Sequence, residues 1–238
     1  MKSPALMITC EHASNALPDF ILRAFRETVI PNEVLDSHRA YDIGAFDVFA
    51  ILVKRLKPDF HCSSRFSRLV VDMNRSMTSK TFFSEYTAKL PDSVKHYMVG
   101  LWEKYREKIE KFVSTKIPSK LRKTETEIPL KVIHLGIHTF TPVLKDVERE
   151  ADVGILYDPS RIGEAKLADI LIKNIRERAP WLRIRKNYPY LGKSDGLTTS
   201  LRHKFGAAYA GIEIEINQKL LKAETTTLPT DSEEAEND

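Results

Sequence analysis

The stretch Lys131-Val-Ile-His-Leu-Gly-Ile-His138-Thr-Phe-Thr-Pro142 decides the fold of this chain. It opens as an apolar, β-branched run and stops at a proline-containing turn, which is the pattern of a buried strand that runs into a loop. His138 lies where the predicted strand ends, and in α/β sheets binding sites form at strand ends. His138 is therefore a candidate metal ligand, and the alternative is a core histidine whose ring is satisfied by its neighbours.

The segments around this stretch alternate between strand-like and helix-like patterns. Strands are predicted at 5–10, 68–73, 153–157, 182–186 and 210–216, and helices at 19–28, 42–56, 93–115 and 163–178. The chain shows no internal repeat and no linker that would mark a domain boundary. We therefore expect an α/β fold in which 1–222 form one domain and the acidic stretch 223–238 is a disordered tail.

Composition limits the class of protein. Hydrophobic residues make up 42% of the 238, enough to bury a substantial core. No stretch of about eighteen uncharged apolar residues exists, so we expect no membrane span. The first ten residues lead directly into Glu11 and His12, which is typical of a first strand and not of a secretory signal. Cys10 and Cys62 form no disulfide framework, and a cytoplasmic location is the default expectation.

The charge balance favours an anionic partner. The net charge is +4, but six of the 33 acidic residues lie in 223–238, so the remainder of the chain is more basic. An excess of positive charge is compatible with a small carboxylate or with nucleic acid. The lysines are mixed with acids in segments such as 104–111, which is typical of a solvated helix face. We therefore expect a small-molecule carboxylate as the partner and no nucleic acid; composition leaves the oligomeric state open.

Two polar blocks supply candidate metal ligands. Cys10-Glu-His-Ala-Ser-Asn15 directly follows a predicted strand, and its serine and asparagine are ordinary turn and capping residues, whereas capping does not require His12. In Asp36-Ser-His-Arg-Ala-Tyr-Asp42, the two-residue spacing of Asp36 and His38 suits a ligand pair or a hydrogen-bonded outer shell. Asp42 has a simpler interpretation as the cap of the next helix.

Two further blocks supply candidates for substrate binding and proton transfer. Ser67-Arg-Leu-Val-Val-Asp-Met-Asn-Arg75 places Arg68 and Arg75 around an apolar run, and a guanidinium beside an amide can bind a carboxylate. The alternative for Arg75 is a salt bridge, for example to Asp72. In Glu213-Ile-Glu-Ile-Asn-Gln218, alternation puts both glutamates on one strand face, which is costly unless cations face them or the strand is an exposed edge. Together the four blocks contain the groups of a mononuclear zinc hydrolase.

These blocks resemble the N-formylglutamate amidohydrolase family, which is related to the zinc carboxypeptidases and aspartoacylases. The resemblance spans about residues 5–221 and rests on five ordered blocks: Cys10–Asn15, His38–Ala45, Arg68–Arg75, Gly136–Pro142 and Ile214–Gln218, with 154–157 and 187–196 as further matches. It implies a single three-layer α/β/α domain with a mixed, mainly parallel sheet, and a zinc-dependent amidohydrolase activity.

The resemblance also assigns roles to individual residues. His12 and His138 match two histidine ligands of Zn²⁺, and Glu215 matches the general base. Asn74 and Arg75 match a carboxylate-binding pair, and Arg68 sits like the arginine that polarises the scissile carbonyl.

The chain departs from the related carboxypeptidases at one ligand. Their ligand glutamate follows the first histidine by three residues, and this chain has Asn15 there. Since asparagine is a poor zinc ligand, we predict Asp36 as the third ligand, with Glu11 and His38 as the other candidates.

Three functions are compatible with the sequence. The first is hydrolysis of a small N-acyl amino acid, nominally N-formyl-L-glutamate to formate and glutamate. The second is a carboxypeptidase-like deacylase or peptidase that acts on another acyl amino acid. The third is a non-catalytic protein of the same fold that binds a small anion, for which Asn15 is the main argument.

Overall fold

A computed structural model describes residues 3–24, 30–122 and 128–221. Its centre is a six-stranded sheet with the spatial order β2-β1-β3-β8-β6-β7. In that order the strands are Phe60–Ser63, Ala5–Cys10, Val132–Phe140, Tyr209–Asn217, Val153–Leu156 and Ile184–Lys186. A separate hairpin joins β4 (Val143–Leu144) to β5 (Val147–Glu148).

The sheet is mixed and mainly parallel, as predicted. Neighbours from β2 to β8 are parallel, β6 runs antiparallel to β8, and β7 is parallel to β6. The carboxyl ends of β1, β3 and β8 consequently meet at one edge of the sheet, where α/β proteins bind ligands. Since β8 lies inside the sheet, its two glutamates do not belong to an exposed edge strand.

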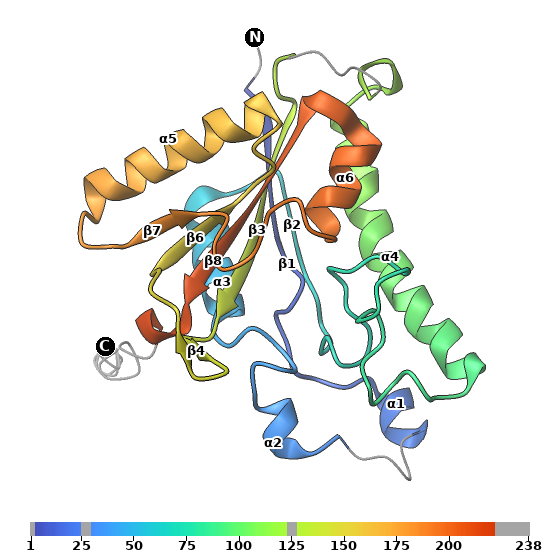
Figure 1. Ribbon diagram of the computed structural model, residues 1–238. Coiled ribbons are helices and arrows are strands. Elements are labelled where there is room, and N and C mark those ends of the chain that lie inside the picture. The colour runs from blue at the N-terminus through green and yellow to red at the C-terminus, as the bar shows by residue number, and fades with distance from the viewer. Residues whose placement is uncertain (1–2, 25–29, 123–127, 222–238) are drawn as a thin grey trace, which may run out of the picture.

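Helices cover both faces of the sheet and complete the predicted α/β/α arrangement (Figure 1). On one face, α4 (Asp92–Lys116) and α6 (Leu197–Phe205) pack on apolar strand residues such as Met7 and Val132. On the other face, α3 (Ala45–Leu56) and α5 (Ile162–Arg178) pack on Leu135, Ile137 and Ile155. The two-residue alternation of β3 thus divides its side chains between two cores.

Short helices connect the larger elements. These are α1 (Asp19–Ala24), α2 (Asn32–Leu35) and three 3₁₀ turns at Ser119–Leu121, Gly206–Ala208 and Gln218–Leu220. None of the described helices is both long enough and apolar enough to cross a membrane.

Several local predictions differ from the structure. The strand predicted at 68–73 is wrong: the segment forms successive turns, with Val70 N–H donating to Ser67 O and Arg75 N–H to Asp72 O. Its apolar side chains are buried, so the apolar pattern correctly indicated burial but did not indicate the backbone conformation. Strand β2 and helix α6 were not predicted. Residues 25–29 of the first predicted helix and the tail at 223–238 lie outside the described residues.

Candidate metal centre and active-site cavity

The parallel strands bring distant polar residues together. His12 follows the end of β1, His138 lies near the end of β3, and Glu215 lies near the end of β8. In the register of β3 and β8, His138 is directly paired with Glu215. All three side chains are buried, and all three line one cavity of about 720 Å³.

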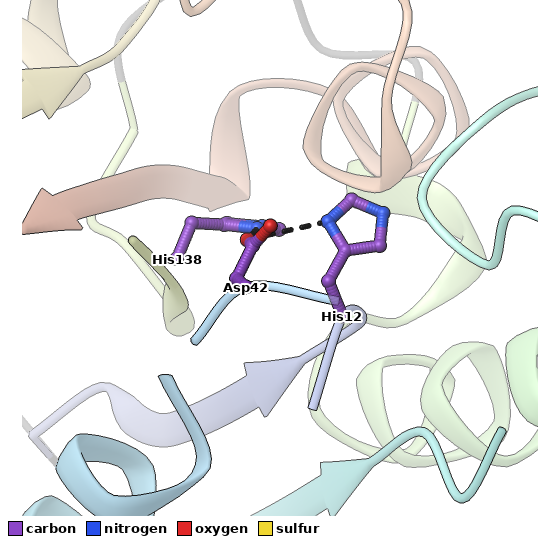
Figure 2. A group of neighbouring side chains, drawn as sticks. All are labelled: His12, Asp42 and His138. Carbon is purple, nitrogen blue, oxygen red and sulfur yellow. Dashed lines mark hydrogen bonds and ion pairs between the residues drawn. The ribbon is translucent and has the colours of Figure 1, made fainter. Parts of the chain in front are cut away.

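His12 and His138 share one carboxylate, that of Asp42. Figure 2 shows the three side chains, with Asp42 Oδ2 lying 3.4 Å from His12 Nδ1 and 2.9 Å from His138 Nδ1. In a tetrahedral zinc site, neighbouring ligand atoms are roughly 3.3 Å apart. The ligand atoms of His12, Asp42 and His138 all lie within 4.8 Å of one another. Two nitrogens and one carboxylate oxygen at these separations fit a divalent metal.

The second nitrogen of each ring faces another buried carboxylate. His12 Nε2 is 2.8 Å from Asp72 Oδ1, and His138 Nε2 is 3.2 Å from Glu11 Oε2. A carboxylate behind the ring is the usual outer partner of a metal-binding histidine, because it fixes the tautomer and orients the ring. Glu11 is itself held by Tyr105, whose hydroxyl donates to Oε1 at 2.9 Å.

The charges of this group point to a cation at its centre. Burial opposes ionisation of Glu11, but its close contact with His138 lowers the pKa of Glu11 to about 2. Burial likewise opposes ionisation of Asp42, yet the charges of Arg68 and His12 hold the pKa of Asp42 well below 3.8. Burial would lower the pKa of His138, but the hydrogen bond to Asp42 and the adjacent Glu11 carboxylate raise it well above 6.5. Buried carboxylates that stay ionised require positive charge, and a metal ion supplies it as a proton does.

The pKa of Glu215 is shifted in the opposite direction from the pKa values of Glu11 and Asp42. Burial raises the pKa of Glu215 to about 8, with further contributions from Asp42 and Glu213. Its Oε2 atom is buried and has no hydrogen-bond partner among the described residues. A carboxylate with a pKa near neutrality and a free oxygen can accept a proton from water, which is the property of a general base.

Arg68 lies beside the histidine group and lines the same cavity. Its Nη1 donates to Asp42 Oδ1 at 3.2 Å, and its Nη2 is 2.6 Å from His12 Nε2. Burial opposes its charge, but Asp42 and Asp72 raise the pKa of Arg68. The guanidinium is thus a fixed positive charge at the wall of the cavity.

Asn74 and Arg75 line the same cavity from the turn that follows Asp72. Asn74 Oδ1 accepts from the N–H of Leu197, at the start of α6, at 2.8 Å. Gly196 permits this approach, since a Cβ there would lie 3.1 Å from Asn74 Oδ1. Arg75 Nη1 donates to Asp195 O at 2.5 Å, and within the described chain it forms no ion pair with Asp72. The alternative prediction of a salt bridge between Arg75 and Asp72 is therefore wrong.

A family model described as N-formylglutamate amidohydrolase matches residues 4–222. The chain belongs to the N-formylglutamate amidohydrolase family. Membership supports an amidohydrolase role. A solved structure, that of gene product Atu2144 from Agrobacterium tumefaciens, is similar at 26% sequence identity and a TM-score of 0.71, covering 91% of this chain and 82% of that one. No curated protein matched the sequence.

The aspartate that lies beside the two histidines is Asp42, whereas the sequence predicted Asp36. Asp36 is exposed and accepts a hydrogen bond from Asn15 Nδ2 at 3.2 Å, away from His12 and His138. Asp42 lies between the two histidines and does not cap a helix, because α3 begins at Ala45 with Gly44 as its N-cap. His38 is exposed as well. Sequence reasoning missed this position of Asp42 beside the two histidines because the residue also fits a capping pattern.

The remaining predicted residues of the amidohydrolase site lie around one cavity. His12, His138, Arg68, Asn74, Arg75 and Glu215 all line it. Their individual roles stay predictions. Asp72 was missed as the partner of His12, although its place between Arg68 and Asn74 was a signal that could have marked it. His134, four residues before His138, is buried in the core, where its ring is hydrogen-bonded to Thr9 and Tyr209.

Proposed function

We propose that this chain hydrolyses the amide bond of a small N-acyl amino acid, with N-formyl-L-glutamate as the nominal substrate. The observation that carries the proposal is Glu215, a buried carboxylate with a raised pKa that is paired in register with His138 and has one oxygen without a hydrogen-bond partner among the described residues. The family match supplies the reaction class.

His12, Asp42 and His138 are the proposed metal ligands, and Asp42 replaces our sequence-based choice of Asp36. Their nitrogen and oxygen donors suit Zn²⁺. When bound, such an ion contributes Lewis-acid chemistry, which activates water and polarises a carbonyl. Glu11 and Asp72 orient the two histidine rings from behind.

The chain's own groups account for the remaining steps. Glu215 accepts a proton from the attacking water and later delivers it to the leaving amine. Arg68 donates N–H groups to the carbonyl oxygen as negative charge develops there. Asn74 and Arg75 bind the α-carboxylate, and this fixes the amide relative to Glu215.

The size of the cavity favours a second candidate within the same reaction class. A volume of about 720 Å³ is typical of sites for drug-sized ligands, and a formyl group fills little of it. Larger acyl groups or a dipeptide are therefore candidate substrates. Varying the acyl group and the amino acid separately, with kcat/KM as the readout, distinguishes this deacylase or peptidase function from deformylation.

The first experiment measures release of formate from N-formyl-L-glutamate by the purified protein, before and after treatment with a chelator, together with metal content by mass spectrometry. We expect about one divalent ion per chain and loss of activity with the ion, restored when Zn²⁺ is added. Activity that survives complete metal removal would overturn the mechanism. Binding of glutamate without turnover, in protein that takes up no metal, would instead favour a non-catalytic anion-binding role.

A further inference from the structure

Helix α4 presents three adjacent side chains to the site, although none of the three lines the cavity. Trp102, Tyr105 and Arg106 follow the i, i+3, i+4 spacing that places residues on one helix face. Tyr105 contacts Glu11, behind the proposed metal ligands. Trp102 and Arg106 instead contact the turn that carries Asn74 and Arg75.

The contacts of Trp102 and Arg106 converge on the main-chain carbonyls of that turn. Arg106 Nη2 donates to the carbonyl oxygens of Asn74 at 2.9 Å, Arg75 at 3.0 Å and Met73 at 3.5 Å. Trp102 Nε1 donates to the carbonyl of Arg75 at 3.0 Å. The Arg106 guanidinium also stacks on Trp102, with its central carbon 4.7 Å from the ring centroid.

The other side of the same turn is fixed by the Asp72 carboxylate. Asn74 N–H donates to Asp72 Oδ1 at 2.9 Å, and the same oxygen lies 2.8 Å from His12 Nε2. The backbone at Asn74 is thus held between the histidine group on one side and α4 on the other. These contacts restrict the backbone of the turn, and they therefore fix the directions in which its side chains point.

Arg106 is energetically unfavourable at this buried position. It is 4% exposed, and no ion pair joins it to any described residue. Burial lowers its pKa, and its Nε atom has no hydrogen-bond partner in the described part of the chain. An unpaired buried charge and an unsatisfied donor are both destabilising. A neutral residue would fill the space with a smaller loss of stability. What the guanidinium adds is its hydrogen bonds to the carbonyls of 73–75.

We propose that Trp102 and Arg106 are positioning residues for substrate binding, which act through the main-chain carbonyls of Asn74 and Arg75. By fixing this turn, they set the point at which the Asn74 amide and the Arg75 guanidinium meet the substrate's carboxylate. This inference rests on the proposed function, in which those two side chains bind that carboxylate.

The first test is Trp102→Phe, which removes the Nε1 donor but keeps an aromatic ring for Arg106 to stack on. Loss of one hydrogen bond to the carbonyl of Arg75 should raise KM for N-formyl-L-glutamate about fivefold, with kcat and bound metal unchanged. The matched control is Trp181→Phe, the same change at an exposed tryptophan, which should leave KM unaltered.

The second test is Arg106→Lys, which keeps the charge but loses the planar donor fork. It should raise KM at least tenfold, again with little change in kcat. The α-carboxamide of N-formyl-glutamate, which lacks the α-carboxylate but keeps the γ-carboxylate, provides the sharpest comparison: if Trp102 and Arg106 act on binding of the α-carboxylate, neither variant should change KM for this analogue. Tyr105→Phe, on the same helix face, should weaken metal binding and leave KM of the metal-saturated enzyme unchanged.

Arg75→Met separates failure of this inference from failure of the proposed function. If Arg75→Met leaves KM unchanged, the assigned carboxylate site is wrong. If Arg75→Met raises KM but Trp102→Phe and Arg106→Lys lower only the melting temperature, or affect the acid and the carboxamide equally, then the two residues are merely structural and the inference is overturned. Support requires that Trp102→Phe adds little to KM in the Arg75→Met background.

Discussion

His138 on β3 and Glu215 on β8 are paired residues of two hydrogen-bonded parallel strands. Their separation is therefore set by the backbone ladder of the sheet, whose strands lie about 4.8 Å apart. The sheet thus holds two side chains next to each other without help from a loop: a histidine whose Nδ1 contacts Asp42, and a glutamate whose Oε2 has no hydrogen-bond partner in the described part of the chain. Four predictions test what this arrangement does.

Glu215→Gln should reduce kcat by about 10²- to 10⁴-fold, because the amide cannot accept a proton from water. KM and bound metal should change little, since Glu215 is not a proposed ligand. The matched control is Glu213→Gln, two residues earlier on the same strand face, which should have a much smaller effect on kcat. Equal losses in the two variants would count against a specific base role for Glu215.

The same substitution should also change stability with pH in the metal-free protein. The folded-state pKa of Glu215, about 8, lies above its ordinary value of 4.5, so folding favours the protonated form. That stabilisation is fully present below pH 4.5 and is lost as pH rises through 8. Glu215→Gln, which mimics the neutral form, should therefore melt at a higher temperature than wild type at pH 9 and at a similar one at pH 4. A difference that does not depend on pH would contradict the raised pKa.

Asp42→Asn should weaken metal binding by more than the roughly 10–100-fold that loss of an outer partner costs. Asp36→Asn is the matched control, and because Asp36 is exposed and bound to Asn15, it should leave affinity unchanged. Competition with a chromogenic chelator measures both. The reverse result would restore Asp36 as the third ligand. Glu11→Gln, which alters an outer partner of His138 and no proposed ligand, should fall between the two.

His134 should make folding sensitive to acid. Burial lowers the pKa of His134 to about 4 from 6.5, so the folded protein favours the neutral ring. The resulting stability is present above pH 6.5 and is lost as pH falls toward 4, at up to about 1.4 kcal/mol per pH unit. His134→Gln should remove this contribution, measured as the pH dependence, between pH 6.5 and 4.5, of its free energy of urea unfolding relative to that of wild type. His203→Gln, at an exposed position of α6, should retain it.

Local pattern in the sequence predicted the central strands β3 and β8 and the residues on each of their faces. Residues 131–138 alternate so that His134 and His138 lie opposite Leu135 and Ile137, and residues 212–216 alternate in the same way around Glu213 and Glu215. A period of two depends only on backbone geometry, so it can be recognised without knowing what packs on the strand. The predicted family and fold, both confirmed, rest on these blocks and their order.

Only the tertiary structure decided which carboxylate joins the histidines and what holds the substrate-binding turn. Asp42 reaches His138 across 96 positions of sequence, and Arg106 reaches the carbonyl of Asn74 across 32. The spacing of Asp36 and His38 favoured Asp36 in the sequence, but nothing in that spacing shows which of the two aspartates, Asp36 or Asp42, turns inward. The choice depends on where the loop after β1 and the start of α3 meet the sheet. It is therefore fixed by packing between distant segments and not by local propensity.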